Sequence, residues 1–214
     1  MTKKIVFDFA GVLFRWHPET MLRRELPQRA SDAASAAHWK REIFQGYEGD
    51  WAEFDRGTIA VPALVRRIAR RTGLAPAEVQ TVVERVPFEL QPITETVQWL
   101  AQLRDEGRAL YFLSNMPEPY AAHLERENAF VGWFERGVFS ARVQHIKPER
   151  EIFELAARRF DAAPSELVFL DDIVPNVEMA RALGWNAIHF RDAAQARREL
   201  RALTRAGPGK TTEA

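Results

Sequence analysis

The chain has 214 residues, of which 46% are hydrophobic and 28% are charged, a composition that fits one large globular domain or a core domain with a smaller insert. Thirty basic and thirty acidic side chains cancel, so bulk charge attracts the chain neither to nucleic acid nor to an anionic membrane. The sequence contains no cysteine, which excludes disulfides and zinc–cysteine sites, and no apolar stretch approaches the roughly 18–20 residues of a membrane helix. We therefore expect a soluble, cytoplasmic protein with no nucleic-acid or membrane partner, either a monomer or a homodimer.

The first predicted strand is the apolar run Ile5–Phe7 near the N-terminus. Similar runs follow at Ala109–Leu113, Leu167–Leu170 and Ala187–Phe190, with a weaker candidate at Gly137–Ser140. The apolar residues are continuous rather than alternating with polar ones, which is typical of strands buried on both faces of a parallel sheet.

Helical patterns separate the later strands. Thr94–Glu106 carries apolar residues on one face and is followed by Gly107, Glu149–Phe160 has the same spacing, and Val177–Leu183 is followed by Gly184. Strands that alternate with helices of this length predict an α/β fold, a doubly wound parallel sheet with right-handed crossovers.

The stretch from 16 to 90 interrupts this alternation, because it contains several helical faces but no convincing buried strand. We predict a helical cap domain at 16–90, inserted after the first strand of a core domain that consists of 1–15 and 91–205. The final segment, 206–214 (AGPGKTTEA), is short, polar and interrupted by Gly and Pro, and we predict that it is a disordered tail.

Polar side chains follow three of the predicted strands at the point where each strand ends. Asp8 follows the first strand, Ser114 and Asn115 follow the second, and the pair Asp171 and Asp172 follows the third. In a doubly wound sheet, ligands bind beyond the carboxyl ends of the strands, so we expect these side chains to converge there.

Together with Lys147, which precedes the helix at 149–160, these residue types indicate phosphoryl transfer. Three converging carboxylates repel one another unless a divalent cation lies among them, and oxygen-only ligands favour Mg²⁺ over zinc. An aspartate beside that metal, such as Asp8, can attack phosphorus and form an aspartyl-phosphate. The Ser114 hydroxyl and the Lys147 ammonium can bind the other phosphoryl oxygens.

The same segments resemble four motifs of the haloacid dehalogenase (HAD) superfamily, in the branch with a small helical cap after the first strand (subfamily IA-like). FDFAGVL resembles the first motif, LSN the second, HIKPE the third and FLDDIVPN the fourth, and they occur in the family's order. The resemblance implies a Rossmann-like core with Asp8 as the nucleophile. It implies that Ser114 and Lys147 take part in catalysis and that Ser114, Asn115 and Lys147 bind the substrate.

The resemblance also implies a magnesium site made of Asp8, Asp172, the neighbouring Asp171 and the backbone carbonyl of Ala10, in which Asp172 is favoured as the ligand and Asp171 supports it. Asn176 supports the acidic loop. Position 10 departs from the family pattern, because most phosphatases of the family carry there a second aspartate that acts as general acid and base. Ala10 has no proton to give to the leaving group, a role that typically contributes about 10²–10⁴-fold to the rate.

Several functions follow from these residues. The leading hypothesis is a Mg²⁺-dependent hydrolase, a phosphatase for a small phosphorylated metabolite. One alternative is a metal-independent 2-haloacid dehalogenase, whose relatives typically lack the acid pair of the fourth motif. A phosphonatase needs a Schiff-base lysine, for which Lys40 is the only candidate between Phe14 and Lys147. A non-catalytic relative that binds a phosphorylated ligand is the third alternative. His17 and His145 are open candidates for the missing proton donor, although a surface or packing role is the simpler interpretation.

Overall fold

A computed structural model describes residues 3–205, so the predicted tail at 206–214 lies outside the described residues. Five parallel strands form one sheet in the order β3-β2-β1-β4-β5. The strands are β1 (Lys4–Phe7), β2 (Leu110–Ser114), β3 (Arg136–Phe139), β4 (Leu167–Asp171) and β5 (Asn186–His189). The predicted doubly wound α/β fold is confirmed, and the weak candidate at 137–140 is a strand at one edge of the sheet.

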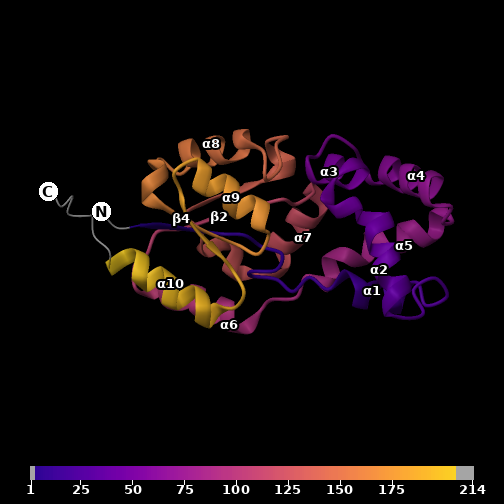
Figure 1. Cartoon of the computed structure of the whole chain (residues 1–214), viewed down its shortest axis with the longest axis horizontal. Helices are drawn as coiled ribbons and strands as arrows, with labels where there is room; N and C mark the ends of the chain where they lie inside the picture. The colour runs from indigo at the N-terminus through magenta and orange to yellow at the C-terminus, as the bar shows by residue number, and fades with distance from the viewer. Residues whose placement is uncertain (1–2, 206–214) are drawn as a thin grey trace, which may run out of the picture.

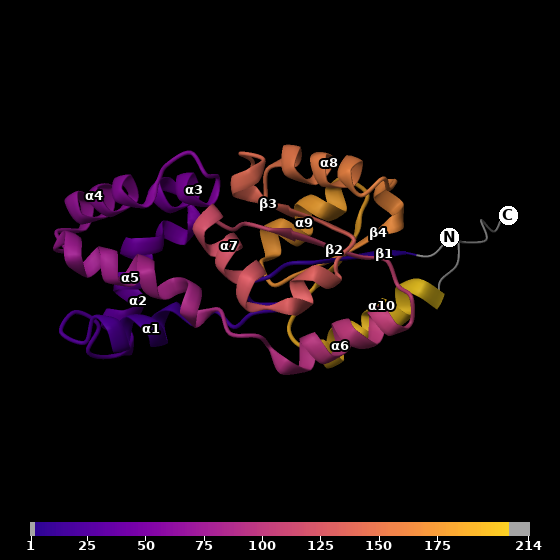
Figure 2. The ribbon, with the colours of Figure 1, turned by 180° about the vertical axis from the view of Figure 1, so that it is seen from behind.

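Helices cover both faces of this sheet (Figure 1). Those that follow β1 in the core are α6 (Thr94–Asp105), α7 (Glu118–Glu127), α8 (Arg150–Arg159), α9 (Val174–Ala182) and α10 (Ala193–Arg205), with short 3₁₀ helices at Ala129–Trp133, Ser140–Arg142 and Pro164–Glu166. Figure 2 shows α6 and α10 side by side on one face, while α8 and α9 lie on the other. The helix predicted to begin at Val177 begins instead at Val174, because Pro175 is tolerated in the first turn of a helix, where its missing N–H is not needed.

The central strand β1 packs against helices on both faces of the sheet, as its consecutive apolar residues show. Ile5 and Phe7 belong to a buried cluster with residues of α6 and α10, whereas Val6 between them belongs to a second cluster with residues of α8 and α9. Successive side chains of a strand point to opposite faces, so a strand between two helical layers must be apolar at every position.

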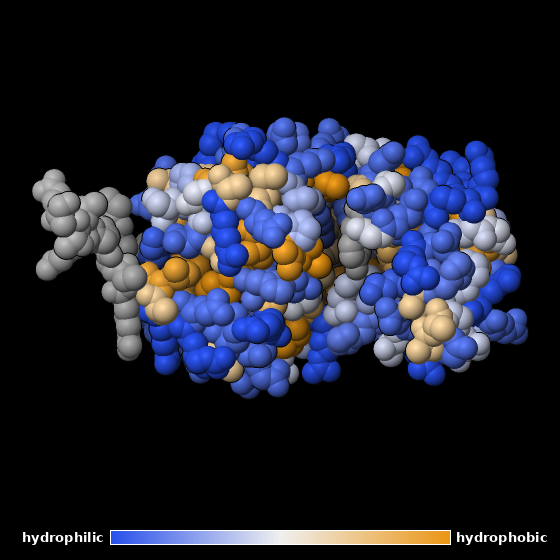
Figure 3. Space-filling view, in the orientation of Figure 1, coloured by the Kyte–Doolittle hydropathy of each residue, from blue (hydrophilic) through white to orange (hydrophobic). Residues whose placement is uncertain are grey.

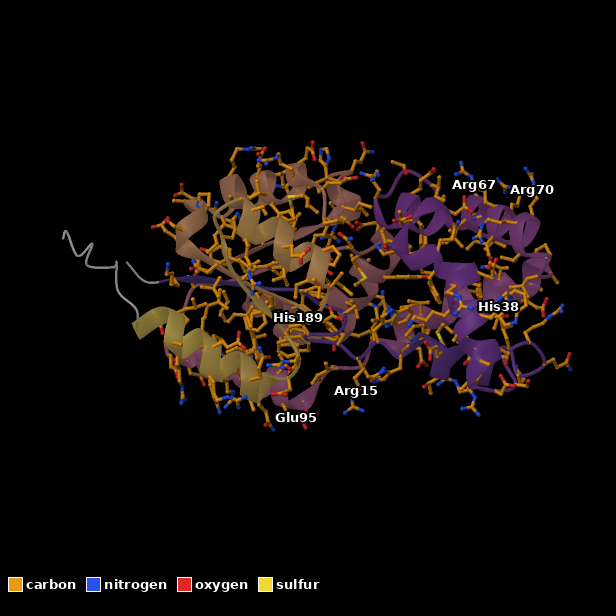
Figure 4. The ribbon with its side chains drawn as sticks, viewed as in Figure 1. Arg15, His38, Arg67, Arg70, Glu95 and His189 are labelled. Atoms are coloured by element: carbon orange, nitrogen blue, oxygen red, sulfur yellow. The ribbon has the colours of Figure 1, made fainter. Side chains whose placement is uncertain are left out.

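Between β1 and α6 the chain forms a group of helices that we call the helical insert. It consists of α1 (Pro18–Glu25), α2 (Ala33–Phe44), the 3₁₀ helix Gln45–Tyr47, α3 (Gly49–Asp55), α4 (Val61–Thr72) and α5 (Pro76–Glu89). The insert lies beside the sheet, at the end toward which the carboxyl ends of the strands point (Figure 1). Arg67 and Arg70 project from α4 on the outer side of the insert (Figure 4), as expected for a solvated basic face. Its treatment as a separate domain stays a prediction.

None of the described helices combines the length and the apolar character that crossing a membrane requires.

Candidate active site

A cavity of about 510 Å³ lies between the strand ends and the helical insert. From the sheet side it is lined by Asp8, Ala10, Lys147 and Asp172, and from the insert by several residues that include Asp55. In Figure 3, apolar side chains reach the surface where the sheet part meets the insert, whereas the outer face of the insert is mostly hydrophilic. The strands β1 and β4 lie next to each other at the centre of the sheet, where its strand order reverses, and this is the position at which such folds bind ligands.

Asp8 is held by the turn that follows β1. Its Oδ1 atom accepts a hydrogen bond of 2.7 Å from the backbone N–H of Phe9 and lies 2.8 Å from Nζ of Lys147. The backbone carbonyl of Phe9 accepts from the N–H groups of Leu13 and Phe14 at 2.8 Å, which folds residues 9–14 into a tight loop. No described residue bonds to Oδ2 of Asp8, so this oxygen is free to meet a substrate.

Lys147 is buried between two carboxylates. Its Nζ lies 2.7 Å from Oδ2 of Asp171 as well as 2.8 Å from Asp8. Burial disfavours the ammonium form, but the attraction of Asp171 and Asp8 outweighs it and raises the pKa of Lys147 above its ordinary value. The ammonium is therefore charged and fixed beside Asp8.

Asp171 has its hydrogen-bonding capacity filled by protein groups. Besides Lys147, it accepts from the backbone N–H of Ile173 at 2.8 Å, and Nδ2 of Asn176 lies 3.0 Å from each of its two oxygens. Asn176 thus ties the loop after β4 to the first turn of α9. Asp171 does not line the cavity, which suits a supporting role beside Asp172.

Asp8, Asp171 and Asp172 offer carboxylate oxygens that lie within 4.8 Å of one another. Burial raises the pKa of Asp8 to about 8 and that of Asp172 to about 6; the neighbouring carboxylates add to this effect, and the Lys147 ammonium opposes it. Oδ1 of Asp172 is buried without a partner among the described residues, and its backbone carbonyl is held by Nε2 of His189 at 3.0 Å. Three carboxylates with one ammonium and one unpaired buried oxygen fit a divalent cation with oxygen ligands, because such an ion removes the charge excess.

The second motif contributes two residues in different ways. Ser114 is fully buried at the end of β2, and its Oγ has no partner among the described residues, although it does not line the cavity. Asn115 lines the cavity, but its side chain donates to the backbone carbonyl of Lys147 at 2.9 Å and accepts from the N–H of Lys147 at 2.7 Å. In this structure Asn115 positions Lys147, and its contact with a substrate stays a prediction.

The two histidines considered as proton donors do not line the cavity. His17 is exposed at the start of α1, and His145 faces Glu149, with Nδ1 at 3.8 Å from Oε2. His189 is the last residue of β5 and is half-buried, and His38 lies in the insert (Figure 4). Three acids that line the cavity were not identified as site residues by the sequence analysis, namely Glu48, Glu149 and Asp55. The buried one of the three is Asp55, at the end of α3. The only local signal for it is an acid that directly follows the apolar residue Phe54 in a segment without a motif.

A doubly wound sheet with buried carboxylates at its switch point is the architecture of an α/β enzyme. The family model described as a haloacid dehalogenase-like hydrolase matches residues 2–184, and the chain therefore belongs to this family of hydrolases, as the motifs predicted.

Three known proteins show how the similarity extends over the chain. A sesquiterpene phosphatase of Aspergillus oryzae is 27% identical over 202 residues, which cover 94% of this chain and 96% of the relative. A D-ribitol-5-phosphate phosphatase of Bacteroides thetaiotaomicron is 22% identical over 209 residues, or 94% and 97% of the two chains. The structure of a HAD family enzyme from the same bacterium, in complex with magnesium and inorganic phosphate, superposes with a TM-score of 0.71 at 21% identity, over 92% of this chain and 99% of that one.

Proposed function

We propose that the protein is a Mg²⁺-dependent phosphatase that hydrolyses phosphate monoesters of apolar alcohols through an aspartyl-phosphate on Asp8. The observation that carries this proposal is the composition of the cavity, which has a cluster of carboxylates and one lysine at one end and mostly apolar side chains elsewhere. The carboxylates and the lysine supply phosphoryl transfer, and the apolar side chains select the organic group that carries the phosphate.

Asp8 is the nucleophile in this proposal. Lys147 and the Phe9 N–H fix its Oδ1, which leaves Oδ2 to attack phosphorus in line with the departing oxygen. Lys147 also neutralises charge on the phosphoryl oxygens, a contribution that is large in a buried site. The Ser114 hydroxyl is buried and has no partner among the described residues, and it does not line the cavity. Its donation to another of these oxygens therefore requires that the bound phosphoryl group reach the end of β2.

The residues that would hold Mg²⁺ are Asp8, Asp172 and the backbone carbonyl of Ala10, with Asp171 and Asn176 fixing the loop behind them. When bound, the ion offsets the negative charge of the carboxylates and of the phosphoryl group. The unpaired Oδ1 of Asp172 is the feature of this structure that fits such an ion.

The rest of the cavity favours an apolar leaving group. Its apolar lining comes from the insert and from the loops of the core: Trp16, Trp51, Ala52, Val86, Leu90, Met116, Pro117, Tyr120, Ile146, Ile173 and Pro175. Ile173, at 40% exposure, continues this surface outward beside the exposed Val174. Of the two relatives named as phosphatases, the one for a sesquiterpene fits this wall better than the one for a polyol phosphate.

The cations of the cavity argue against polyanionic and 2-haloacid substrates. Among the described lining residues the cations are Lys147, which is paired with Asp8 and Asp171, and Arg56, which forms two contacts of 2.6 and 2.7 Å with Glu149. Because Arg56 is paired and Lys147 faces the phosphoryl group in this proposal, no cation among the described lining residues is left for a second phosphate. The carboxylate of a haloacid would meet only a lysine that two aspartates already pair. Lys40, the candidate for a phosphonatase, pairs with Glu19 at 3.1 Å and does not line the cavity.

The test begins with p-nitrophenyl phosphate, whose leaving group needs little protonation. We expect turnover that requires Mg²⁺, that Asp8→Asn abolishes, and that Asp105→Asn on the outer surface of α6 leaves unchanged. Absence of turnover in the wild type with Mg²⁺ contradicts the proposal and favours the binding-protein alternative, and activity on 2-haloacids without metal favours the dehalogenase.

A second measurement tests the apolar leaving group. In a series of n-alkyl phosphates, each buried methylene contributes up to about 0.8 kcal/mol, so kcat/KM should rise up to roughly fourfold per carbon until the cavity is filled. Farnesyl monophosphate should then be preferred to ribitol 5-phosphate. A kcat/KM that does not change along the n-alkyl series, or a preference for ribitol 5-phosphate over farnesyl monophosphate, refutes this part of the proposal.

A further inference from the structure

We propose that Asp55, on the helical insert, is the general acid and base that replaces the acid missing at position 10. This inference rests on the proposed phosphatase function and adds to it a catalytic residue from outside the four motifs. It answers the chemical difficulty raised by Ala10, because alkyl leaving groups depart slowly unless they receive a proton.

The first argument is the burial of Asp55 without a partner. Its side chain lines the cavity that holds Asp8, and the residue is only 5% exposed. Within residues 3–205, no hydrogen bond or ion pair engages its carboxyl group, whereas the fully buried Asp171 has every lone-pair direction used and Asp8 is held through its Oδ1. A buried carboxyl that is neither paired nor bonded is costly, so its retention in a ligand cavity points to a role with the ligand.

The second argument is that the backbone of Asp55 is fixed to the sheet part. Its carbonyl accepts a hydrogen bond from Oγ of Ser140, which itself accepts from the N–H of Met116 at 2.8 Å. The next residue, Arg56, makes its bidentate contact with Glu149, two residues after Lys147. The acid therefore has a defined position relative to the strand ends, although it belongs to the insert.

The electrostatic surroundings agree with a proton donor. Burial raises the pKa of Asp55 to about 8, and the nearby Lys147 ammonium lowers it by less. The other titratable groups that line the cavity are the Tyr120 phenol, whose pKa is raised by burial and by Asp55, the Lys147 ammonium, and the carboxyl groups of Asp8, Asp172, Glu48 and Glu149. Arg56 on the same helix end is neutralised by Glu149. At neutral pH the Asp55 carboxyl thus carries the proton that a departing alkoxide needs.

The proposed steps balance as follows. Oδ2 of Asp8 forms a bond to phosphorus while the phosphorus–oxygen bond of the ester breaks, and the leaving oxygen keeps the electron pair and takes the proton of Asp55. The products are an alcohol, the aspartyl-phosphate and an Asp55 carboxylate. The carboxylate then accepts a proton from water as the water oxygen attacks phosphorus, the bond to Asp8 breaks, and inorganic phosphate, ionised Asp8 and protonated Asp55 result.

The experiment compares two leaving groups in Asp55→Asn. We expect kcat/KM for n-octyl phosphate to fall at least 100-fold, and that for p-nitrophenyl phosphate, whose leaving group needs little protonation, to fall less than tenfold. The matched control is Glu53→Gln on the same helix, since Glu53 pairs with Arg67 at 2.8 Å and does not line the cavity, and neither substrate should be affected. Adding Ala10→Asp to Asp55→Asn should restore at least part of the octyl phosphate activity.

Equal losses on both substrates, or no loss on either, overturn the inference while leaving the phosphatase proposal intact. Absence of Mg²⁺-dependent p-nitrophenyl phosphate hydrolysis in the wild type overturns the phosphatase proposal itself. If Asp55→Asn does not fold, the wild type still decides, because the ratio of octyl to p-nitrophenyl turnover should fall as the pH rises above about 8, where Asp55 loses its proton. A ratio that stays constant up to about pH 9.5, well past the pKa of Asp55, contradicts the role of Asp55.

Discussion

Gly11 offers a direct test of the metal site, because a methyl group there reaches the acid pair. Its φ of +81° lies in the left-handed region, and a Cβ atom added to it would lie 2.3 Å from Oδ2 and 2.7 Å from Oδ1 of Asp172. To reach ordinary contact at 3.4 Å, the carboxylate must retreat by about 1 Å. Gly11→Ala therefore combines backbone strain with displacement of a proposed magnesium ligand.

The two effects can be separated with a matched control. Gly73 has nearly the same backbone conformation, with φ at +74°, and a Cβ atom added there would meet nothing within 4 Å, so Gly73→Ala carries the strain alone. The strain costs about 1–2 kcal/mol in both variants. In Gly11→Ala we expect in addition a loss of Mg²⁺ affinity of about 10–100-fold, comparable to the loss when the groups that orient a metal ligand are removed.

The assay is urea unfolding with and without saturating Mg²⁺, together with the Mg²⁺ dependence of p-nitrophenyl phosphate hydrolysis. Without metal, both variants should lose similar stability. With metal, the wild type and Gly73→Ala should gain stability by binding, and Gly11→Ala should gain less at the same concentration. If Gly11→Ala keeps the Mg²⁺ dependence of the wild type, Asp172 does not hold the ion where the structure implies.

Three further predictions concern buried charge and packing. Lys147→Met leaves Asp8 and Asp171 without their ammonium and should cost about 3–5 kcal/mol in metal-free urea unfolding; a loss below about 1 kcal/mol contradicts the buried pairing. Gly137→Ala places a Cβ 1.9 Å from the Phe112 ring, and it should lower the free energy of unfolding by about 1–3 kcal/mol without changing the Mg²⁺ dependence of activity. Gly132→Ala, with open space around it, should not cause this loss of stability. Asp8 and Asp172 have folded pKa values raised above the ordinary 3.8, so their stabilising contribution is complete below that pH and is lost as the pH rises through about 6 and 8. The melting temperature in EDTA should therefore fall as the pH rises from about 5.5 to about 8.5, and Mg²⁺ should make this fall smaller. A melting temperature that rises over this range in EDTA contradicts the raised pKa values.

The fold could be predicted from the sequence because its physical signals are local. Val6 and its neighbours are apolar at consecutive positions, as a strand covered on both faces requires, and the carboxyl ends of parallel strands share one edge. Asp8, Asp171 and Asp172 therefore converge in the structure, as expected. The sequence pattern places the start of α9 three residues late, because Pro175 gives the same signal in a loop as in the first turn of a helix.

The division of roles within the site does not follow from the residue types alone, although the family resemblance implies that Asp172 is the metal ligand and Asp171 its support. Asp171 and Asp172 are adjacent and chemically identical, yet the first is enclosed by Lys147 and Asn176 whereas the second keeps an oxygen with no partner among the described residues. Which of two neighbouring acids faces the cavity depends on the register of β4 and on the packing of α9 against it, and both are properties of the assembled fold. The same holds for Asn115, whose amide is committed to the backbone of Lys147.

Asp55 is the case in which the tertiary structure matters most, because its position relative to Asp8 depends on how the insert meets the sheet. An acid at position 10 would lie on the same loop as the nucleophile and would be in place whatever the insert does. An acid at position 55 reaches the leaving group only while the contacts of Ser140 with its carbonyl and of Arg56 with Glu149 hold the insert against the strand ends. Proton delivery is then tied to closure of the cavity, which also keeps bulk water from the aspartyl-phosphate until the alcohol has left. The comparison of octyl and p-nitrophenyl phosphates bears on this coupling as well, because only the substrate that needs a proton depends on the contacts that place Asp55.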